Sequence, residues 1–441
     1  MARLNRIARR TTHEGAPARA FPPETELRRT LMNALLWEDQ FYEDGVSITD
    51  RIAALVPNVE PETVAALAVE ARETMKLRHA PLLLVREMAR HATHRGLVAE
   101  TLARIVQRPD ELTEFLAIYW AGALGPQEQR KREPVSAQAK KGLAKALRKF
   151  DAYQLAKYDR DGPVRLRDVL FLVHARPADA DQEKVWKALV DGTLRPADTW
   201  ETALSAGADK RATFERLIAE KRLGSLALLR NLRLMRNAGV PRPTIARAIA
   251  EISAERVLPF RFIAAARHAP EFEAELERAM FASLAGQPRL EGRTRLLVDV
   301  SASMNVPLSA RSETTRLDAA AGLAILAREL FAEVEIFTFS SDIVRIAPRH
   351  GFALRDAIFA SQPHGGTRLG KAVETLDRRG ARLVVISDEQ SGDAVPAPRA
   401  RGYILNVASY RNGVRSGDWE RVDGFSEAVI AWIAAREREG A

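Results

Sequence analysis

The sequence predicts a multidomain α and α/β protein, in which an all-helical N-terminal region precedes a doubly wound parallel sheet. Three observations support this prediction. Apolar residues recur at helical spacing through residues 21–290, and no convincing run of strands interrupts them. From Gly292 onward, short apolar segments alternate with helical ones. One of these segments ends in Asp299-Val300-Ser301-Ala302-Ser303, where three oxygen-bearing side chains lie close together.

The composition is that of a globular protein with a large core. The chain has 441 residues, of which 46% are hydrophobic and 28% charged, so we expect two or three domains. It contains no stretch of about 18 uncharged apolar residues, and its N-terminus lacks the apolar segment of a secretory signal. Cysteine is absent, which excludes disulfides and cysteine-based zinc sites and fits the cytoplasmic location that we expect.

The N-terminal region divides into an arm and a long series of helices. Residues 1–20 contain basic residues without a following apolar segment, so we expect a flexible basic arm. Pro61 begins a helix in which Val64, Leu67 and Ala71 recur on one face. Further helical segments begin at or are separated by prolines, namely Pro81, Pro109, Pro241 and Pro259. Many short helix pairs across residues 21–290 indicate an α-solenoid.

The C-terminal region, residues 291–441, alternates strands with helices. The expected elements in chain order are strands at 295–300, 334–340 and 343–347, with a helix at 317–331 after the first strand, then helices at 352–360 and 369–377, strands at 383–387 and 404–409, and a closing helix at 425–438. This order is typical of a mostly parallel sheet with helices on both faces.

Oxygen-bearing side chains follow the strands of this region, at the carboxyl ends where open α/β sheets bind their ligands. Five of them resemble the metal-ion-dependent adhesion site of von Willebrand factor A domains: Asp299, Ser301, Ser303, Thr367 and Asp388. Carboxylate and hydroxyl oxygens are hard ligands, so we expect Mg²⁺ or another divalent cation such as Mn²⁺. For Asp-x-Ser-x-Ser taken alone, a polar turn is an equally good interpretation.

Positive charge is concentrated in one part of the chain. Residues 291–441 contain 20 basic and 20 acidic residues, so the entire excess of nine positive charges lies in residues 1–290. Residues 130–176 alone contain 13 basic and 5 acidic residues. This distribution indicates a polyanionic partner for the N-terminal region.

Within that segment, cations at helical spacing lie opposite Leu143, Leu147 and Phe150. The candidate residues for contacts to a nucleic acid here are Lys141, Lys145, Arg148, Lys149, Lys157, Arg160, Arg165 and His174. Cations with an interleaved tyrosine and histidine suit phosphate contacts and base stacking, although a solvated helix face is the alternative interpretation. Arg230 and Arg233 share one stripe of a later helix and are a second candidate.

Four segments link these features to a known family: residues 75–82 (Met-Lys-Leu-Arg-His-Ala-Pro-Leu), 157–177, 199–201 (Thr-Trp-Glu) and 227–233 (Ala-Leu-Leu-Arg-Asn-Leu-Arg). Their order, followed by the metal-type loop, resembles the TROVE family, named for telomerase, Ro and vault proteins. Within that family the chain is most similar to the bacterial orthologues of the Ro autoantigen. The resemblance covers about residues 21–441.

The resemblance implies a fold and a function. It implies HEAT-like repeats closed into a ring, with a von Willebrand factor A-type domain bridging the ends. It also implies that small noncoding Y-like RNA binds the outer surface, where Lys157 and His174 correspond to RNA contacts. Single-stranded 3′ ends of misfolded or maturing RNA are expected in the central hole. In bacterial relatives Y RNA tethers the exoribonuclease polynucleotide phosphorylase, so a role in RNA quality control is expected.

The departures from this pattern are local. Asp161 occupies a position where the family pattern predicts a cation, and neighbouring Arg160 is the expected substitute. Arg230 and Arg233 are assigned to the hole or its rim. A monomer is expected.

The sequence allows three other interpretations of the function: an enzyme, a metal-dependent protein-adhesion scaffold without RNA, and a metal-chelatase component. The serines lack a Gly-x-Ser-x-Gly context and the histidines are scattered, so we predict no enzymatic activity. The scaffold remains the principal alternative, in which Asp299 and Asp388 serve protein docking. The basic segment argues against the chelatase.

Overall fold

The computed structural model describes residues 11–12, 16–19, 21–33, 45–74, 77–120, 134–252, 257, 259–284, 289–308, 314–408, 413–414, 418–423, 430, 433 and 437. These residues form two compact units. Residues between Val46 and Leu223 form the first, called here the helical unit. Residues up to Gly45 and from Gly224 onward together form the second, called here the composite unit because both ends of the chain contribute to it.

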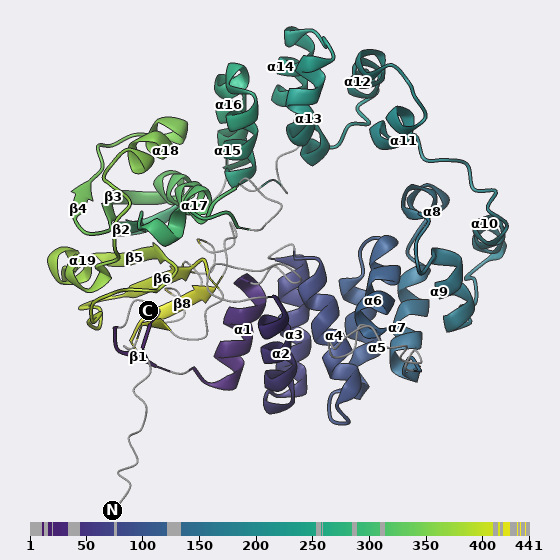
Figure 1. The fold of residues 1–441 in the computed structure, drawn as a ribbon, viewed down its shortest axis with the longest axis horizontal. Helices are drawn as coiled ribbons and strands as arrows, with labels where there is room; N and C mark the ends of the chain where they lie inside the picture. Colours follow the sequence, from purple (N-terminus) through teal and green to yellow (C-terminus); the bar gives the residue numbers. More distant parts are fainter. Residues whose placement is uncertain are drawn as a thin grey trace, which may run out of the picture. The chain divides into compact units, whose positions relative to one another are not determined.

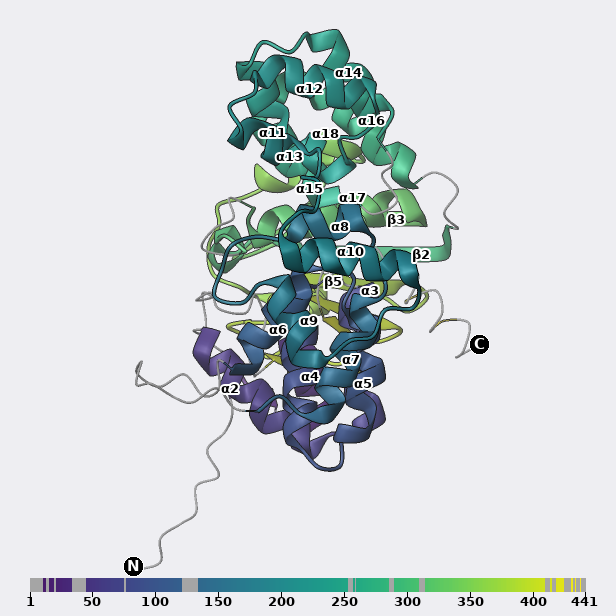
Figure 2. The ribbon, with the colours of Figure 1, turned by 90° about the vertical axis from the view of Figure 1, so that its right-hand side faces the viewer.

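The helical unit consists of short helices, most of which pack against neighbours in the chain, and a long connection leads from α10 to the pair α11 and α12 (Figures 1 and 2). They are α2 (Gly45–Leu55), α3 (Pro61–Glu73), α4 (His79–Arg90), α5 (Val98–Ile105), α6 (Asp110–Trp120), α7 (Ala137–Leu147), α8 (Ala152–Tyr158), α9 (Leu166–Val173), α10 (Ala180–Asp191), α11 (Trp200–Ser205) and α12 (Lys210–Ala219). Prolines stand at the start of α3 and just before α6, as the sequence predicts. The predicted helical character of this region is therefore confirmed.

Helices α5 and α7 approach each other unusually closely. A Cβ atom at Gly142 would lie 2.9 Å from both the carbonyl oxygen of Ala99 and the Cβ atom of Leu102. Only glycine fits at this point, because any side chain would push the two helices apart. Leu143 and Leu147 are fully buried on the same side of α7, which leaves its basic residues on the other side.

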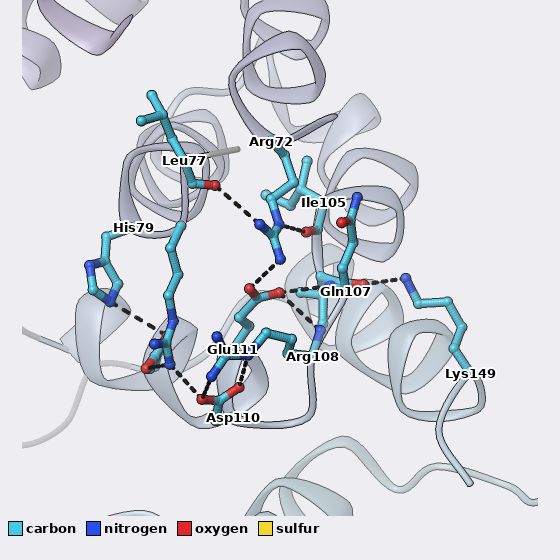
Figure 3. A network of polar contacts seen from close by, with 12 residues as sticks. Arg72, Leu77, His79, Ile105, Gln107, Arg108, Asp110, Glu111 and Lys149 are labelled. Atoms are coloured by element: carbon cyan, nitrogen blue, oxygen red, sulfur yellow. Dashed lines mark hydrogen bonds and ion pairs between the residues drawn. The ribbon is translucent and has the colours of Figure 1, made fainter. Parts of the chain in front are cut away.

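A buried ion pair joins α3 to α6 (Figure 3). The Arg72 guanidinium donates to Glu111 Oε1 at 2.5 Å and to the carbonyl oxygen of Ile105 at 3.0 Å. The other carboxylate oxygen of Glu111 accepts from the backbone N–H groups of Gln107 and Arg108, at 2.7 and 3.1 Å. One carboxylate thus accepts hydrogen bonds both from a buried guanidinium and from the backbone N–H groups of the turn between α5 and α6.

The predicted family segment at residues 77–82 contributes to the same region. Arg78 forms ion pairs with Asp110 and Glu114 on α6, and His79 lies 3.5 Å from Glu114. Met75 and Lys76 lie outside the described residues. In this structure the segment stabilises the packing of α4 against α6.

The composite unit contains the helices α1 (Pro23–Asn33), α13 (Ser225–Asn237), α14 (Arg242–Ala250), α15 (Pro259–His268), α16 (Glu273–Leu284), α17 (Arg316–Leu330), α18 (Gly351–Phe359) and α19 (Leu369–Leu376). Its strands are β1 (Ala18–Arg19), β2 (Leu290–Asp299), β3 (Phe331–Phe339), β4 (Ile343–Arg345), β5 (Arg382–Ser387), β6 (Gly402–Asn406), β7 (Gly413–Val414) and β8 (Glu420–Asp423). Six strands form one sheet in the order β4-β3-β2-β5-β6-β8 (Figure 1). Only β4 runs antiparallel to its neighbour within that sheet.

The predicted doubly wound sheet is confirmed. Every residue of β5 and β6 is buried, as expected for central parallel strands with both faces covered. Helix α19 packs on one face against Leu297 and Val385. The edge strand β8 was not predicted, because Glu420-Arg421-Val422-Asp423 lacks an apolar run. Most of the predicted closing helix at 425–438 lies outside the described residues, although Ile430, Ile433 and Glu437 are helical.

The N-terminal segment packs against the C-terminal sheet domain. Strand β1 pairs with β7, and the Thr12 hydroxyl donates to the carbonyl oxygen of Ser391 at 2.7 Å. Arg29 on α1 is fully buried and donates to Glu389 Oε1 at 2.7 Å. The described part of residues 11–19 is thus paired with residues almost 400 positions later in the chain. This pairing differs from the flexible arm that the sequence predicts for residues 1–20. Hydrogen-bond partners so distant in the chain leave no local pattern.

No helix in the described part of the chain is long and apolar enough to cross a membrane.

Replacing Arg72 by Met is expected to destabilise the helical unit by about 3–5 kcal/mol, because it leaves the buried Glu111 carboxylate without its cation. Arg104→Met is the matched control, since Arg104 of α5 pairs with Glu73 of α3 at the surface. Its exposed ion pair is worth about 1 kcal/mol or less. Native-state hydrogen exchange of amides in α3 and α6 measures both losses, and equal losses would contradict this account.

Candidate metal centre and basic surfaces

The carboxyl ends of β2 and β5 bring two acidic side chains to one edge of the sheet. The two strands are parallel neighbours in register, with Val298 opposite Ile386. Asp299 ends β2, and Asp388 directly follows β5. Both carboxylates are fully buried, and the Ser387 hydroxyl donates to Asp299 Oδ2 at 2.6 Å. Parallel pairing therefore places both acids where ligands of such sheets bind.

Two hydroxyl groups lie beside Asp299. The Ser301 backbone N–H donates to Asp299 Oδ1 at 2.9 Å, which turns the chain sharply after the strand. The hydroxyls of Ser301 and Ser303 are 3.2 Å apart, and both serines are buried. Their spacing of two residues allows both side chains to point to the same side of this loop.

A third loop supplies Thr367, which is also buried. Its carbonyl oxygen accepts from the Gly392 N–H at 2.8 Å, and the carbonyl oxygen of Gly365 accepts from the Ala302 N–H at 3.1 Å. The loop around Thr367 is therefore joined by hydrogen bonds to the loops that follow β2 and β5. The structure brings together the three loops that hold the five predicted metal ligands.

Electrostatics at this edge favour a cation. Burial, and then the negative charge of Asp388, raise the pKa of Asp299 to about 7. Arg316, at the start of α17, lies 3.6 Å from Asp388 and supplies one positive charge. Two buried carboxylates and two neighbouring hydroxyls remain a hard, net anionic donor set, which fits a divalent cation such as Mg²⁺ or Mn²⁺.

The basic face of α7 is formed as predicted, but its cations differ in what they contact. Lys141 is exposed, whereas Lys145 pairs with Glu100 of α5. Arg148 donates to the carbonyl oxygen of Arg176 at 2.9 Å. Lys149 donates to the carbonyl oxygens of Ala103 and Val106 at the end of α5, and burial lowers its pKa. Lys149 therefore holds two helices together, besides its place in the basic segment.

The predicted cations beyond α7 lie around α8 and α9. The Lys157 ammonium is 5.6 Å from the centre of the Tyr158 ring, which Arg108 also covers. Arg160 is exposed. Arg165 is paired with Asp161 at 3.1 Å, so the acid that departs from the family pattern neutralises a predicted cation.

His174 is exposed at the end of α9 in a left-handed conformation, with φ of 49°. The bond from Arg148 to Arg176 ties the end of α7 to the segment just after His174. The structure thus brings Arg148 and His174 into one surface region. Arg230 and Arg233 belong to the composite unit, where both are exposed on α13.

Comparison with known proteins identifies the family. The model of the TROVE domain matches residues 26–192 and 192–321. The chain belongs to the TROVE domain family. No curated protein sequence matches the chain. Among solved structures, the RO (RSR) protein of Deinococcus radiodurans is similar, with a TM-score of 0.60 and 20% sequence identity over 95% of this chain and 100% of that one.

The chain is thus a TROVE protein with a Ro-like fold, and its predicted class, an RNA-binding protein, follows from that family. The TROVE match extends from α1 to the first turns of α17. It includes Asp299, Ser301 and Ser303 and ends before Thr367 and Asp388. The family match therefore does not extend to the last two positions.

Sequence reasoning missed the residues that hold the loop after β5. Glu389 is fully buried and accepts from Arg29 and from the Val414 N–H at 3.0 Å. Arg421 lies 3.6 Å from the same carboxylate. Burial alone would raise the pKa of Glu389, but the two guanidiniums hold it below its usual value. An acid directly after Asp388 was the available signal, and its partners on distant segments were not predictable.

Glu389→Gln is expected to destabilise the composite unit of this TROVE protein by about 3–5 kcal/mol, because Arg29 would lose its buried counter-charge. Glu374→Gln on the exposed side of α19 is the control and should cost less than about 0.5 kcal/mol. Urea unfolding followed by hydrogen exchange of β5 and β6 measures the difference. An unchanged free energy of unfolding in Glu389→Gln would show that this pair does not stabilise the loop.

Proposed function

We propose that this TROVE protein binds small noncoding Y-like RNA through the basic surface of its helical unit and takes part in RNA quality control. Membership of the TROVE family is the observation on which the proposal rests. The exposed cations Lys141 and Arg160 and the exposed imidazole of His174 support it, because phosphate contacts need hydrogen-bond donors that face solvent. Lys145 and Arg165 contribute less, since each is paired with an acid.

Single-stranded 3′ ends of misfolded or maturing RNA are the second proposed ligand. Arg230 and Arg233 are the proposed contacts, since they are exposed and one helical turn apart on α13. By analogy with the bacterial members of the family, the Y-like RNA would tether the exoribonuclease polynucleotide phosphorylase, which would degrade or trim the bound RNA. The protein itself is proposed to be non-enzymatic, monomeric and cytoplasmic.

A metal-dependent docking role accompanies RNA binding. Asp299, Ser301, Ser303, Thr367 and Asp388 would hold Mg²⁺ or Mn²⁺ at the edge of the sheet. The bound cation would supply an open coordination position to a carboxylate of a partner protein. The convergence of three loops around two buried acids supports this second role. A scaffold of this kind without any RNA ligand is the alternative to the main proposal.

The first experiment is to purify the full chain at low salt, measure its absorbance ratio at 260 and 280 nm, and sequence any RNA released. Discrete structured small RNAs support the main proposal. A protein free of nucleic acid that also fails to bind both structured RNA and single-stranded 3′ ends would favour the scaffold.

Lys157→Ala combined with His174→Asn is expected to weaken binding of Y-like RNA by about 1–3 kcal/mol per lost contact. Asparagine is chosen because it tolerates the left-handed backbone at position 174. Lys184→Ala on α10, where the lysine is paired with Asp181, is the control for lost positive charge. Gel-shift titration at moderate salt compares the variants. Unchanged affinity in the double variant would place the RNA surface elsewhere.

Mg²⁺ at 100 times its dissociation constant is expected to stabilise the wild-type protein by about 2.7 kcal/mol. The melting temperature should therefore rise. Asp299→Asn should abolish this increase, because it removes one of the two buried charges. Asp356→Asn, an exposed acid of α18, should retain it. Differential scanning fluorimetry with and without chelator measures the shift. An equal response in all three proteins would place the metal elsewhere.

A further inference from the structure

Two neighbouring acids follow β5, and each of them faces a buried arginine. Asp388 and Glu389 are both fully buried. The side chain of Arg316, the first residue of α17, is 5% exposed and lies 3.6 Å from Asp388 Oδ2. Glu389 pairs instead with Arg29 of α1 and with Arg421 of β8. The loop that carries the candidate metal ligand Asp388 is therefore balanced by positive charges from distant parts of the chain.

The two acids differ in how closely they meet their arginines. Arg29 donates to Glu389 at 2.7 Å, which is the length of a strong hydrogen bond. The guanidinium of Arg316 lies 3.6 Å from Asp388 and donates to the carbonyl oxygen of Ser303 at 3.5 Å. Both partners of Arg316 belong to the five candidate metal-ligand residues. Arg316 thus lies between the loop after β2 and the loop after β5.

The stability of α17 does not explain the position of Arg316. As the first residue of the helix, it lies at the positive end of the helix dipole, where a cation is disfavoured. The helix start is already capped by Thr315 and Asp318, whose side chains each accept from the other's backbone N–H group. The acid that Arg316 faces is therefore the better explanation for a cation at this position.

A guanidinium here has opposite effects on the two states of a metal site. It is a permanent positive charge, because arginine does not lose its proton in proteins. Asp299 and Asp388 are buried together, so a nearby cation lowers the free energy of the site without a metal. The same charge repels a divalent cation held by these carboxylates. Arg316 therefore stabilises the metal-free state at the expense of metal affinity.

We propose that Arg316 is a built-in cation of this site, which balances Asp388 when no divalent cation is bound and competes with the divalent cation for that carboxylate. The inference rests on the metal-dependent role proposed above, and it adds the residue that sets the metal affinity. The loops keep their arrangement when the metal leaves, because Arg316 remains between them. Docking through the metal is then reversible and depends on the concentration of free Mg²⁺.

Isothermal titration calorimetry of the full chain with magnesium chloride, and separately with manganese chloride, tests the competition. Arg316→Met removes the charge and keeps an unbranched side chain, so it should bind either metal about ten-fold or more tightly than the wild type. Arg316→Lys retains the charge and should bind with nearly the wild-type affinity. Unchanged affinity in the methionine variant overturns the proposal. Equally tight binding by the lysine variant also overturns it, because charge would then not set the affinity.

Arg382→Met is the matched control. Arg382 is likewise a buried arginine, paired with Glu437, but it begins β5 and so lies at the opposite end of that strand from Asp388. Its replacement should destabilise the composite unit and leave the affinity for Mg²⁺ unchanged. A gain in affinity equal to that of Arg316→Met would overturn the proposal, since the loss of any buried arginine of the unit would then have the same effect.

Thermal unfolding in the presence of a chelator tests the charge balance without metal. Arg316→Met should melt at a lower temperature than the wild type, because Asp388 loses its cation, and should gain more from added Mg²⁺. The double variant Arg316→Met, Asp388→Asn no longer contains the uncompensated charge and should be more stable in chelator than Arg316→Met. This comparison also applies if Arg316→Met folds only with metal. A double variant that is no more stable would overturn the pairing.

The calorimetry also distinguishes this proposal from the broader one. If neither the wild type nor Arg316→Met binds Mg²⁺ or Mn²⁺, the metal-dependent role fails and the competition fails with it. If both bind with the same affinity, only the assignment of Arg316 fails. Weak binding by the wild type together with tight binding by the methionine variant supports both proposals.

Discussion

The buried pair of Arg29 and Glu389 is the interaction on which the composite unit depends most directly. It joins the first described helix to the loop after β5, across 360 positions of the chain. Removing two charges from water is costly, and the cost is offset only when every polar atom has a good partner. Here Glu389 also accepts from Val414, and Phe21 covers the guanidiniums of both Arg29 and Arg421, at 5.1 and 5.2 Å. Because Glu389 follows Asp388, the same pair holds the backbone of the candidate metal loop.

The first turn of α17 contacts both α15 and the loops of the candidate metal site. Asp318 accepts from the Thr315 N–H and so caps the helix, and it also accepts from Arg267 of α15. Arg316, two residues earlier, approaches Asp388 and the carbonyl oxygen of Ser303. One short segment therefore joins α15 to the metal loops.

The sequence predicted those features that are local in the chain. The alternation of strands and helices after Gly292, and the amphipathic pattern of α7, each depend on spacing that is visible within about twenty residues. Asp299, Ser301 and Ser303 were proposed as metal ligands because one loop contains them all. The buried positions of Arg29, Arg316 and Arg421 were not predicted, because a buried arginine resembles a surface arginine until its distant partner is known. Strand β8 was missed because its pairing with β6 stabilises a segment whose own residues favour no strand.

The composite unit encloses the helical unit in the order of the chain, and this arrangement affects folding during synthesis. Domains generally fold as they emerge from the ribosome, with the N-terminal parts first. Helix α1 is an exception, since its main partner Glu389 is translated after 360 further residues. Residues 46–223, which belong to the other compact unit, are translated before Glu389 becomes available to Arg29. Arg29 and the loop after β5 therefore reach their paired arrangement only once residue 389 has been translated, which makes this contact a late step of folding.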